Sequence, residues 1–198
     1  MSMPPKPHKE SHIGALSPEY ALLGLLAQSP AHGYELYQRL STGLSQVWHI
    51  SMSQAYNILN RLETQGNIAG VVQEQDKLPA RRLFHLTPLG QRRYDDWLNA
   101  PSGSSVRSIR LEFLTRLYFA RLAGPQQAHR LVDVQIAETR QGLERLRATL
   151  NGIPGDGLIN RLSLELRIRQ LESILEWLQS CHLAIDSTPS IHFGKVEP

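Results

Sequence analysis

The sequence predicts a mainly α protein in two parts. The first part ends with a two-stranded β-hairpin and one further helix, and the second part is all-helical. Two observations carry this prediction. Apolar residues recur at helical spacing along most of the chain, and the period falls to two only over residues 68–86. A stretch rich in Asn, Pro, Gly and Ser, residues 99–105, separates the two parts and is predicted to be a linker.

The composition is that of a soluble globular protein. Of the 198 residues, 41% are hydrophobic and 20% are charged, and the net charge is +3. No apolar run in the sequence approaches the roughly 20 residues that a membrane span needs. The single cysteine, Cys181, forms no disulfide within the chain, which favours a cytoplasmic location. Because the charge is nearly balanced, composition alone does not indicate a nucleic-acid partner.

Two helices are predicted before residue 50. Residues 1–14 are rich in proline and are expected to form a flexible arm. Ser17, Pro18 and Glu19 combine a capping residue, a proline at the first helical position and an acid near the positive helix end. This signal predicts a buried, almost entirely apolar helix over residues 20–28. A second helix is predicted over residues 34–40.

The third predicted helix lies within residues 51–65 and has two different faces. Ser51 or Ser53 can cap its first turn, and Gly66 ends it. Its apolar residues lie three and four apart and share one face: Ala55, Ile58, Leu59 and Leu62. The other positions are polar: Ser53, Gln54, Asn57, Asn60, Arg61 and Gln65. Such a helix packs on one side and presents hydrogen-bonding groups on the other.

A β-hairpin is predicted directly after this helix, with strands over residues 68–73 and 80–86 and a turn over residues 74–79. Lys77 lies at its tip, and Arg81 and Arg82 lie on the returning strand. Thr87 and Pro88 repeat the signal for a helix start, so a fourth helix is predicted up to residue 98.

Three helices, a basic hairpin and a fourth helix in this order predict a winged helix-turn-helix domain over residues 15–98. In such a domain the third helix enters the major groove of double-stranded DNA, and the wing contacts the backbone. The predicted DNA contacts are Ser53, Gln54, Asn57, Asn60 and Arg61 on the helix, and Lys77, Arg81 and Arg82 on the wing. The alternative is an ordinary amphipathic helix beside a solvated turn.

The C-terminal part, residues 106–185, is predicted to contain helices over residues 106–122, 125–150 and 158–185. The last helix carries two adjacent apolar ladders, which make a face wider than packing against one helix requires. We predict a homodimer through the first ladder: Leu164, Ile168, Leu171, Leu175 and Leu178. The second ladder comprises Leu162, Leu166, Ile174 and Trp177. The alternative is burial of this face within one subunit. Residues 186–198 are expected to form a flexible tail.

The sequence contains no motif of an enzyme. It has no nucleophile triad, phosphate-binding loop or paired-carboxylate pattern, and no cofactor is expected. Trp97, at the end of the fourth predicted helix, is either a packing residue or part of a cavity for an aromatic effector. Cys181 and His182 are adjacent on a predicted helix and point in different directions, so no metal site is expected.

Three stretches resemble the PadR-type transcriptional regulators, the phenolic acid decarboxylase regulators. They are LLGLLAQSPAHGYELYQRL, SQAYNILNRLETQGNI and RRLFHLTPLGQRRYDDWL, and the groups HGYEL, NRLE and LTPLG recur at the spacing of that family. The resemblance covers roughly residues 15–98, and the helical remainder looks like the family's larger C-terminal domain. Asn57 stands where proline is usual in the family, and Asn67 stands where an apolar residue is usual.

The resemblance implies a dimeric DNA-binding regulator, commonly a repressor, and it places Tyr34 and Tyr56 among the DNA contacts. Some members of the family release DNA when they bind phenolic acids. We therefore expect a cytoplasmic homodimeric repressor that leaves its operator when a small, phenolic or aromatic effector binds. Two alternatives remain: an activator with the same fold, and a dimeric ligand-binding or protein-interaction module that does not use DNA.

Overall fold

The computed structural model describes residues 17–75, 78–154 and 157–188 of the chain, and the predicted arm and wing tip lie outside these ranges. The first elements are helices α1 (Glu19–Gln28), α2 (Gly33–Gly43) and α3 (Met52–Thr64). Strands β2 (Ile68–Gln75) and β3 (Leu78–Leu86) and helix α4 (Pro88–Asn99) follow. A two-residue strand, β1 (Ala31–His32), lies between α1 and α2. The predicted order of three helices, a hairpin and a fourth helix is confirmed.

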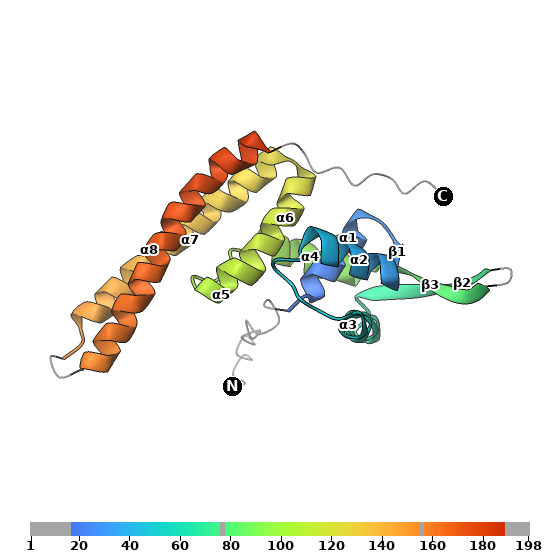
Figure 1. The fold of residues 1–198 in the computed structure, drawn as a ribbon, viewed down its shortest axis with the longest axis horizontal. Helices are drawn as coiled ribbons and strands as arrows, with labels where there is room; N and C mark the ends of the chain where they lie inside the picture. Colours follow the sequence, from blue (N-terminus) through green and yellow to red (C-terminus); the bar gives the residue numbers. More distant parts are fainter. Residues whose placement is uncertain (1–16, 76–77, 155–156, 189–198) are drawn as a thin grey trace, which may run out of the picture.

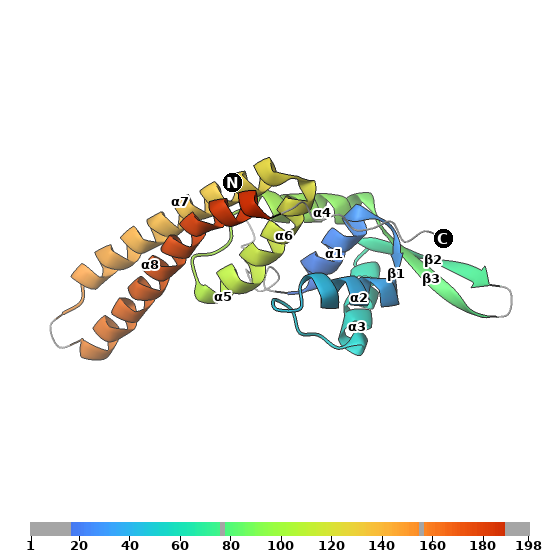
Figure 2. The same cartoon turned by 45° about the horizontal axis from the view of Figure 1, so that its top comes forward.

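The sheet is antiparallel with the strand order β1–β3–β2. Strands β2 and β3 pair from Ile68 opposite Leu86 to Gln73 opposite Arg81, and they form the wing that projects from the molecule in Figures 1 and 2. Sequence analysis missed β1, which pairs with residues 83 and 84 of β3. Two residues are too few to show a period of two, so no sequence pattern marks this strand.

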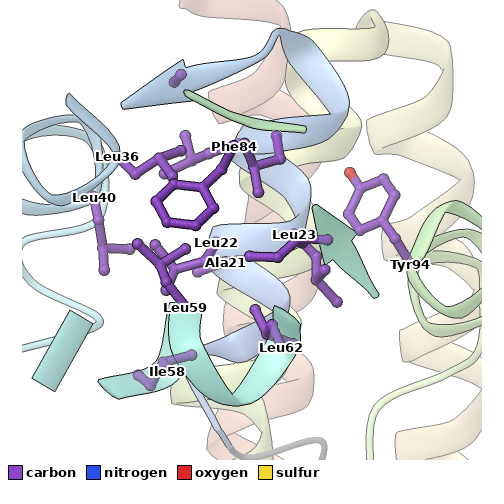
Figure 3. Packing of buried hydrophobic residues seen from close by; sticks show 14 of the residues in the cluster. Ala21, Leu22, Leu23, Leu36, Leu40, Ile58, Leu59, Leu62, Phe84 and Tyr94 are labelled. Atoms are coloured by element: carbon purple, nitrogen blue, oxygen red, sulfur yellow. The ribbon is translucent and has the colours of Figure 1, made fainter. Parts of the chain in front are cut away.

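Helix α1 lies at the centre of the N-terminal core. Most of its apolar residues are almost fully buried, as its nearly all-apolar sequence predicted: Ala21, Leu22, Leu23, Leu25 and Leu26. The inward face of α3 is also the predicted one, because Ala55, Ile58, Leu59 and Leu62 are all buried. Phe84 of β3 fills the space between α1, α2 and α3 (Figure 3). Burial of this face turns the polar residues of α3 outward.

The described residues of the C-terminal part between 106 and 151 and between 158 and 187 are almost all helical, as predicted. Helix α5 (Val106–Ser108), a π-helical segment η1 (Ile109–Phe113) and helix α6 (Leu114–Ala123) follow one another directly. Helices α7 (Pro125–Asn151) and α8 (Leu158–Ser187) form the long antiparallel pair in Figure 1. Sequence analysis predicted one regular helix over residues 106–122 and missed η1. Among the helices described, none is long and apolar enough to cross a membrane.

Helix α6 contacts both halves of the molecule. Phe119 belongs to the N-terminal core, whereas the next residue, Ala120, belongs to a second apolar cluster formed with α7 and α8. The segment between α4 and α5 is anchored as well, because the buried Ser102 N–H donates to the Gln135 side chain of α7 (3.1 Å). The stretch predicted as a linker therefore connects two parts that pack against each other.

The structure corrects the predicted dimer contact. Ile168, Leu171 and Leu178 of α8 are buried within the chain, in two clusters to which α7 contributes Leu143 and Val132. The remaining residues of that ladder, Leu164 and Leu175, are partly buried. Part of the second ladder remains exposed instead. The physical reason is that α7 supplies, inside one subunit, the partner that the sequence analysis assigned to a second subunit.

Candidate nucleic-acid interface

Helix α3 begins at a reciprocal cap. The Ser51 hydroxyl accepts a hydrogen bond from the Gln54 N–H (3.2 Å), and the Gln54 side-chain oxygen accepts one from the Ser51 N–H (2.8 Å). This capping box satisfies donors that the start of a helix leaves free. Gln54, which is predicted to contact DNA, therefore also caps the start of α3, and the residue remains exposed.

The outward face of α3 is largely polar. The side chains predicted to contact DNA are all exposed: Ser53, Gln54, Tyr56, Asn57, Asn60 and Arg61. Within the described ranges, the Asn57 and Asn60 side chains make no hydrogen bond to the protein. A free amide both donates and accepts, which is the pattern that pairs with the major-groove edge of adenine. Asn57 and Asn60 therefore present such free amides on the exposed face of α3.

Arg61 has a different environment. Its Nε and Nη2 atoms lie 2.6 and 2.5 Å from Glu19 Oε1, and Glu19 Oε2 accepts a hydrogen bond from Arg93 Nη2 (2.7 Å). Glu19 is buried, and its negative charge is neutralised by these guanidinium groups. The two ion pairs connect α1 to α3 and to α4. The Arg61 side chain remains half exposed. Sequence analysis did not find this triad because its members are far apart in the chain.

The wing carries the other predicted cations. Arg81 is exposed on β3, and Lys77 lies outside the described residues. Arg82 pairs with Glu63 of α3 (Nη2 to Oε1, 2.5 Å), and its guanidinium carbon lies 5.4 Å from the centroid of the Phe84 ring. The same Glu63 oxygen accepts a hydrogen bond from the Gly70 N–H on β2 (3.0 Å). Arg82 and Glu63 thus hold the wing against α3.

An open hollow of about 570 Å³ brings several of these residues together. It lies between α2, α3 and β3, and its lining includes Tyr34, Tyr56, Asn60, Arg81 and Arg82. Sequence patterns placed these residues on separate elements, and only the family resemblance singled out the two tyrosines. The structure places all five on one open face, where hydroxyl, amide and guanidinium groups are combined.

The HGYEL motif, residues 32–36, builds one wall of this hollow. His32 and Glu35 form a capping box at the start of α2, and His32 Nδ1 lies 3.0 Å from the Arg82 carbonyl oxygen of β3. Gly33 lets the Tyr56 ring lie close to the start of α2, because a Cβ atom there would lie 2.6 Å from the ring in its present position. The motif therefore sets the relative positions of α2, Tyr56 and the wing.

A second hollow, of about 530 Å³, lies where α1, α4 and the η1–α6 segment meet. Trp97 lines it, and its buried ring is stacked on Tyr20 with the ring centroids 4.7 Å apart. The Arg116 guanidinium carbon lies 4.9 Å from the Trp97 ring centroid, and that of Arg93 lies 5.2 Å from the Tyr20 ring centroid. The hollow therefore combines aromatic rings with three arginines, since Arg92 also lines it, and with the carboxylates of Asp96 and Glu112.

Arg116 is only 2% exposed and is held on several sides. Its Nη2 atom pairs with Glu112 Oε1 (2.6 Å), and its Nη1 atom donates to the Ser102 hydroxyl (3.0 Å). Burial lowers the pKa of Arg116, and the charge of Glu112 opposes this effect. Arg116 Nε and the indole N–H of Trp97 are buried with no hydrogen-bond partner in the described part of the chain. Unpaired buried donors are uncommon in native proteins.

Two family models match separate parts of this chain. Residues 22–96, which include α2, α3, the wing and most of α4, match the transcriptional regulator PadR-like family. These residues are similar to that family. Residues 109–186 match a second model, described as the virulence activator alpha C-terminal region. The order of elements predicted for a winged helix-turn-helix domain is confirmed by the structure, and the match of residues 22–96 agrees with the resemblance found in the sequence.

The chain is also similar to known proteins over most of its length. The negative transcriptional regulator PadR of Bacillus subtilis (strain 168) is 25% identical over 181 residues, which cover 85% of this chain and 97% of the relative. Solved structures with similarity include B. subtilis PadR in complex with operator DNA, at 24% identity and a TM-score of 0.43, over 85% of this chain and 98% of that one. Another is B. subtilis PadR in complex with p-coumaric acid, at 24% identity and a TM-score of 0.38, over 86% of this chain and 99% of that one.

Proposed function

We propose that the chain is a sequence-specific DNA-binding transcriptional regulator. Helix α3 enters the major groove, and the wing formed by β2 and β3 contacts the backbone beside it. The observation that carries this proposal is the open face on which Tyr34, Tyr56 and Asn60 lie with Arg81 and Arg82. Amide groups supply contacts to base edges, and guanidinium groups supply contacts to phosphates. The match of residues 22–96 to the PadR-like family supports this role.

Asn57→Ala and Asn60→Ala test the proposed base contacts. Each substitution is expected to weaken binding to DNA from upstream of the gene about 5- to 150-fold, because a well-placed amide–base pair is worth about 1–3 kcal/mol. The melting temperature should not change, since both side chains are exposed and make no hydrogen bond within the described ranges. Fluorescence anisotropy gives the affinities.

Asn160→Ala is the matched control, because Asn160 is an exposed asparagine on α8, distant in the chain from the wing. It should leave DNA affinity unchanged. The assignment of α3 is contradicted when neither Asn57→Ala nor Asn60→Ala weakens binding. That result would favour a ligand-binding or protein-interaction module that does not use DNA.

We also propose that the regulator is a homodimer. Ile159, Leu162 and Leu166 of α8 lie three and four residues apart and are 50–75% exposed, which makes an apolar stripe on the outer side of the helix. A second copy that covers this stripe would give a two-fold assembly with two α3 helices for the two halves of a palindromic operator. This stripe is the proposed dimer contact, in place of the ladder through Ile168 and Leu171 that packs inside the subunit.

Repression is the proposed direction of regulation. The B. subtilis relative is named a negative transcriptional regulator, and its match spans 85% of this chain. A second candidate is activation, because residues 109–186 match a region named for a virulence activator. A reporter gene under the upstream DNA distinguishes the two: its expression rises on deletion of a repressor and falls on deletion of an activator.

We further propose that a small aromatic carboxylate binds beside Trp97 and weakens DNA binding. The rings of Trp97 and Tyr20 and the guanidinium groups of Arg93 and Arg116 line the hollow, and two buried donors lack partners in the described residues. The hollow is lined by residues of α4, which follows the wing, and by residues of the η1–α6 segment, which packs on α7 and α8. A ligand that prefers one arrangement of these elements would shift the DNA-binding equilibrium.

The effector site is tested with p-coumaric, p-hydroxybenzoic and benzoic acids in the DNA-binding assay. At least one acid is expected to weaken DNA binding, and Arg93→Met should reduce the sensitivity to that acid about fivefold or more by removing a positive charge from the hollow. Arg140→Met is the matched control, since Arg140 is an exposed arginine of α7 that does not line the hollow. Equal sensitivity of the two variants, or no response to any acid, would contradict the proposal.

A further inference from the structure

Two histidines meet between α7 and α8, near the beginning of α7 and the end of α8. The rings of His129 and His182 are stacked, with centroids 5.0 Å and planes 9° apart, and their Nδ1 atoms lie 2.7 Å from each other. Each histidine is followed four residues later by an aspartate, and the pairs cross between the helices. His129 Nε2 lies 2.8 Å from Asp186 Oδ1, and His182 Nε2 lies 3.1 Å from Asp133 Oδ1.

The chemistry of the carboxylates determines where the hydrogens lie. An ionised carboxylate only accepts hydrogen bonds, so the Nε2 atom of each histidine carries the hydrogen that it donates to its aspartate. A neutral imidazole has a single N–H, so each Nδ1 atom is then left with a lone pair. Two lone pairs 2.7 Å apart repel each other unless a proton or a metal ion lies between them.

We infer that the Nδ1 atoms of His129 and His182 bind a divalent transition-metal ion such as Zn²⁺. Neutral imidazole is a common ligand of this ion, and a carboxylate bonded to the far nitrogen is the usual group that fixes the orientation and the tautomer of a metal-binding histidine. Asp133 and Asp186 supply this support on both sides. They also contribute two negative charges, which a divalent ion neutralises and a single shared proton does not.

A small movement of the rings is needed to admit the ion. Two zinc–nitrogen bonds of about 2.1 Å at a tetrahedral angle place the nitrogens about 3.4 Å apart, so the two Nδ1 atoms must separate by roughly 0.7 Å. The side chains of His129 and His182 are 27% and 31% exposed, which leaves room for this movement and for water ligands. In the described ranges no three His, Cys, Asp or Glu side chains are arranged to hold a metal, so water completes the coordination.

The ion would join α7 to the last turns of α8. Arg121 of α6 holds the same end of α8, because it donates to the carbonyl oxygens of Ile185 (2.8 Å) and Thr188 (3.0 Å). Cys181 is not part of the site, since its thiol donates to the Trp177 carbonyl oxygen (3.4 Å). The sequence offered only Cys181 beside His182, and no metal was expected because these two neighbours point in different directions. Spacing along one helix does not indicate a partner such as His129 on another helix.

Calorimetric titration of the full-length protein with ZnCl₂ at about pH 7.5 tests the site. The starting protein carries His8→Ala and His12→Ala, so that these histidines of the N-terminal segment do not contribute binding. It is expected to take up one Zn²⁺ per chain. Adding His129→Ala and His182→Ala should abolish this uptake or weaken it at least tenfold. Adding His49→Ala instead is the matched control and should leave it unchanged, because His49 is exposed on the segment before α3.

Asp133→Asn together with Asp186→Asn keeps both imidazoles and provides a second test if the histidine variant does not fold. Loss of the supporting carboxylates is expected to weaken Zn²⁺ binding about 10- to 100-fold. Lowering the pH to about 5.5 should also weaken it, since protons compete for the imidazole nitrogens. The inference is overturned if the starting protein takes up no Zn²⁺, or if a folded His129→Ala, His182→Ala variant binds it equally well.

Discussion

Gly90→Ala is expected to lower the free energy of unfolding by about 3 kcal/mol, because overpacking a rigid contact typically costs 1–3 kcal/mol and here the obstacle is backbone. A Cβ atom at Gly90 would lie 1.9 Å from the Asn67 carbonyl oxygen and 2.8 Å from its carbonyl carbon. Helix α4 has little freedom to move away, since the Thr87 N–H donates to that same oxygen (3.1 Å). This contact explains the glycine of the LTPLG motif.

Urea unfolding followed by circular dichroism measures this effect. Gly152→Ala is the matched control, because the nearest atom to its Cβ position is the Thr149 carbonyl oxygen at 3.6 Å, an ordinary contact. Its stability should stay within about 0.5 kcal/mol of the unsubstituted protein. Equal stabilities of the two variants would show that the junction between α4 and the wing tolerates a side chain, contrary to this prediction.

Arg116→Met is expected to lower the free energy of unfolding by about 3 kcal/mol or more, since removing one partner of a buried ion pair typically costs 3–5 kcal/mol. The reason is that the buried Glu112 carboxylate loses the guanidinium that lies 2.6 Å away. The Ser102 hydroxyl loses a donor as well. Methionine fills much of the arginine volume, so the loss reflects charge and hydrogen bonding more than an empty cavity.

A double-mutant cycle separates the ion pair from other effects of the substitution. Arg116→Met combined with Glu112→Gln should be less destabilised than the sum of the two single variants, because the combined variant leaves no unpaired charge. Additive effects in urea unfolding would mean that Glu112 and Arg116 do not interact energetically. Arg140→Met, on an exposed arginine of α7, controls for the loss of a positive charge alone.

Local patterns in the sequence were sufficient to predict the elements around the candidate interface. The spacing of Ala55, Ile58, Leu59 and Leu62 identified the buried face of α3, and therefore also which residues point outward. The change of period identified the wing, and Thr87 with Pro88 identified the start of α4. These features were predictable because each depends on residues that are neighbours along the chain.

Contacts between distant segments were not predictable in this way. Glu19 bonds to Arg61 and Arg93 across three helices, which assigns Arg61 a structural role that its exposed position on a polar helix face did not suggest. The apolar ladder that includes Ile168 and Leu171 packs against α7 of the same chain, whereas the sequence analysis assigned it to a contact with a second subunit. The width of an apolar face indicates how much area must be buried but does not identify what buries it.

The proposed recognition of DNA is tested most directly by the anisotropy of labelled DNA from upstream of the gene, titrated with the full-length protein from about 50 to 200 mM salt. A scrambled duplex of the same composition is the control. We predict tight binding to the upstream DNA alone, with an affinity that falls steeply as salt rises, since the arginines of the wing displace counterions from phosphates. Weak and equal binding to both duplexes would contradict the assignment of α3 and the wing as a sequence-reading surface.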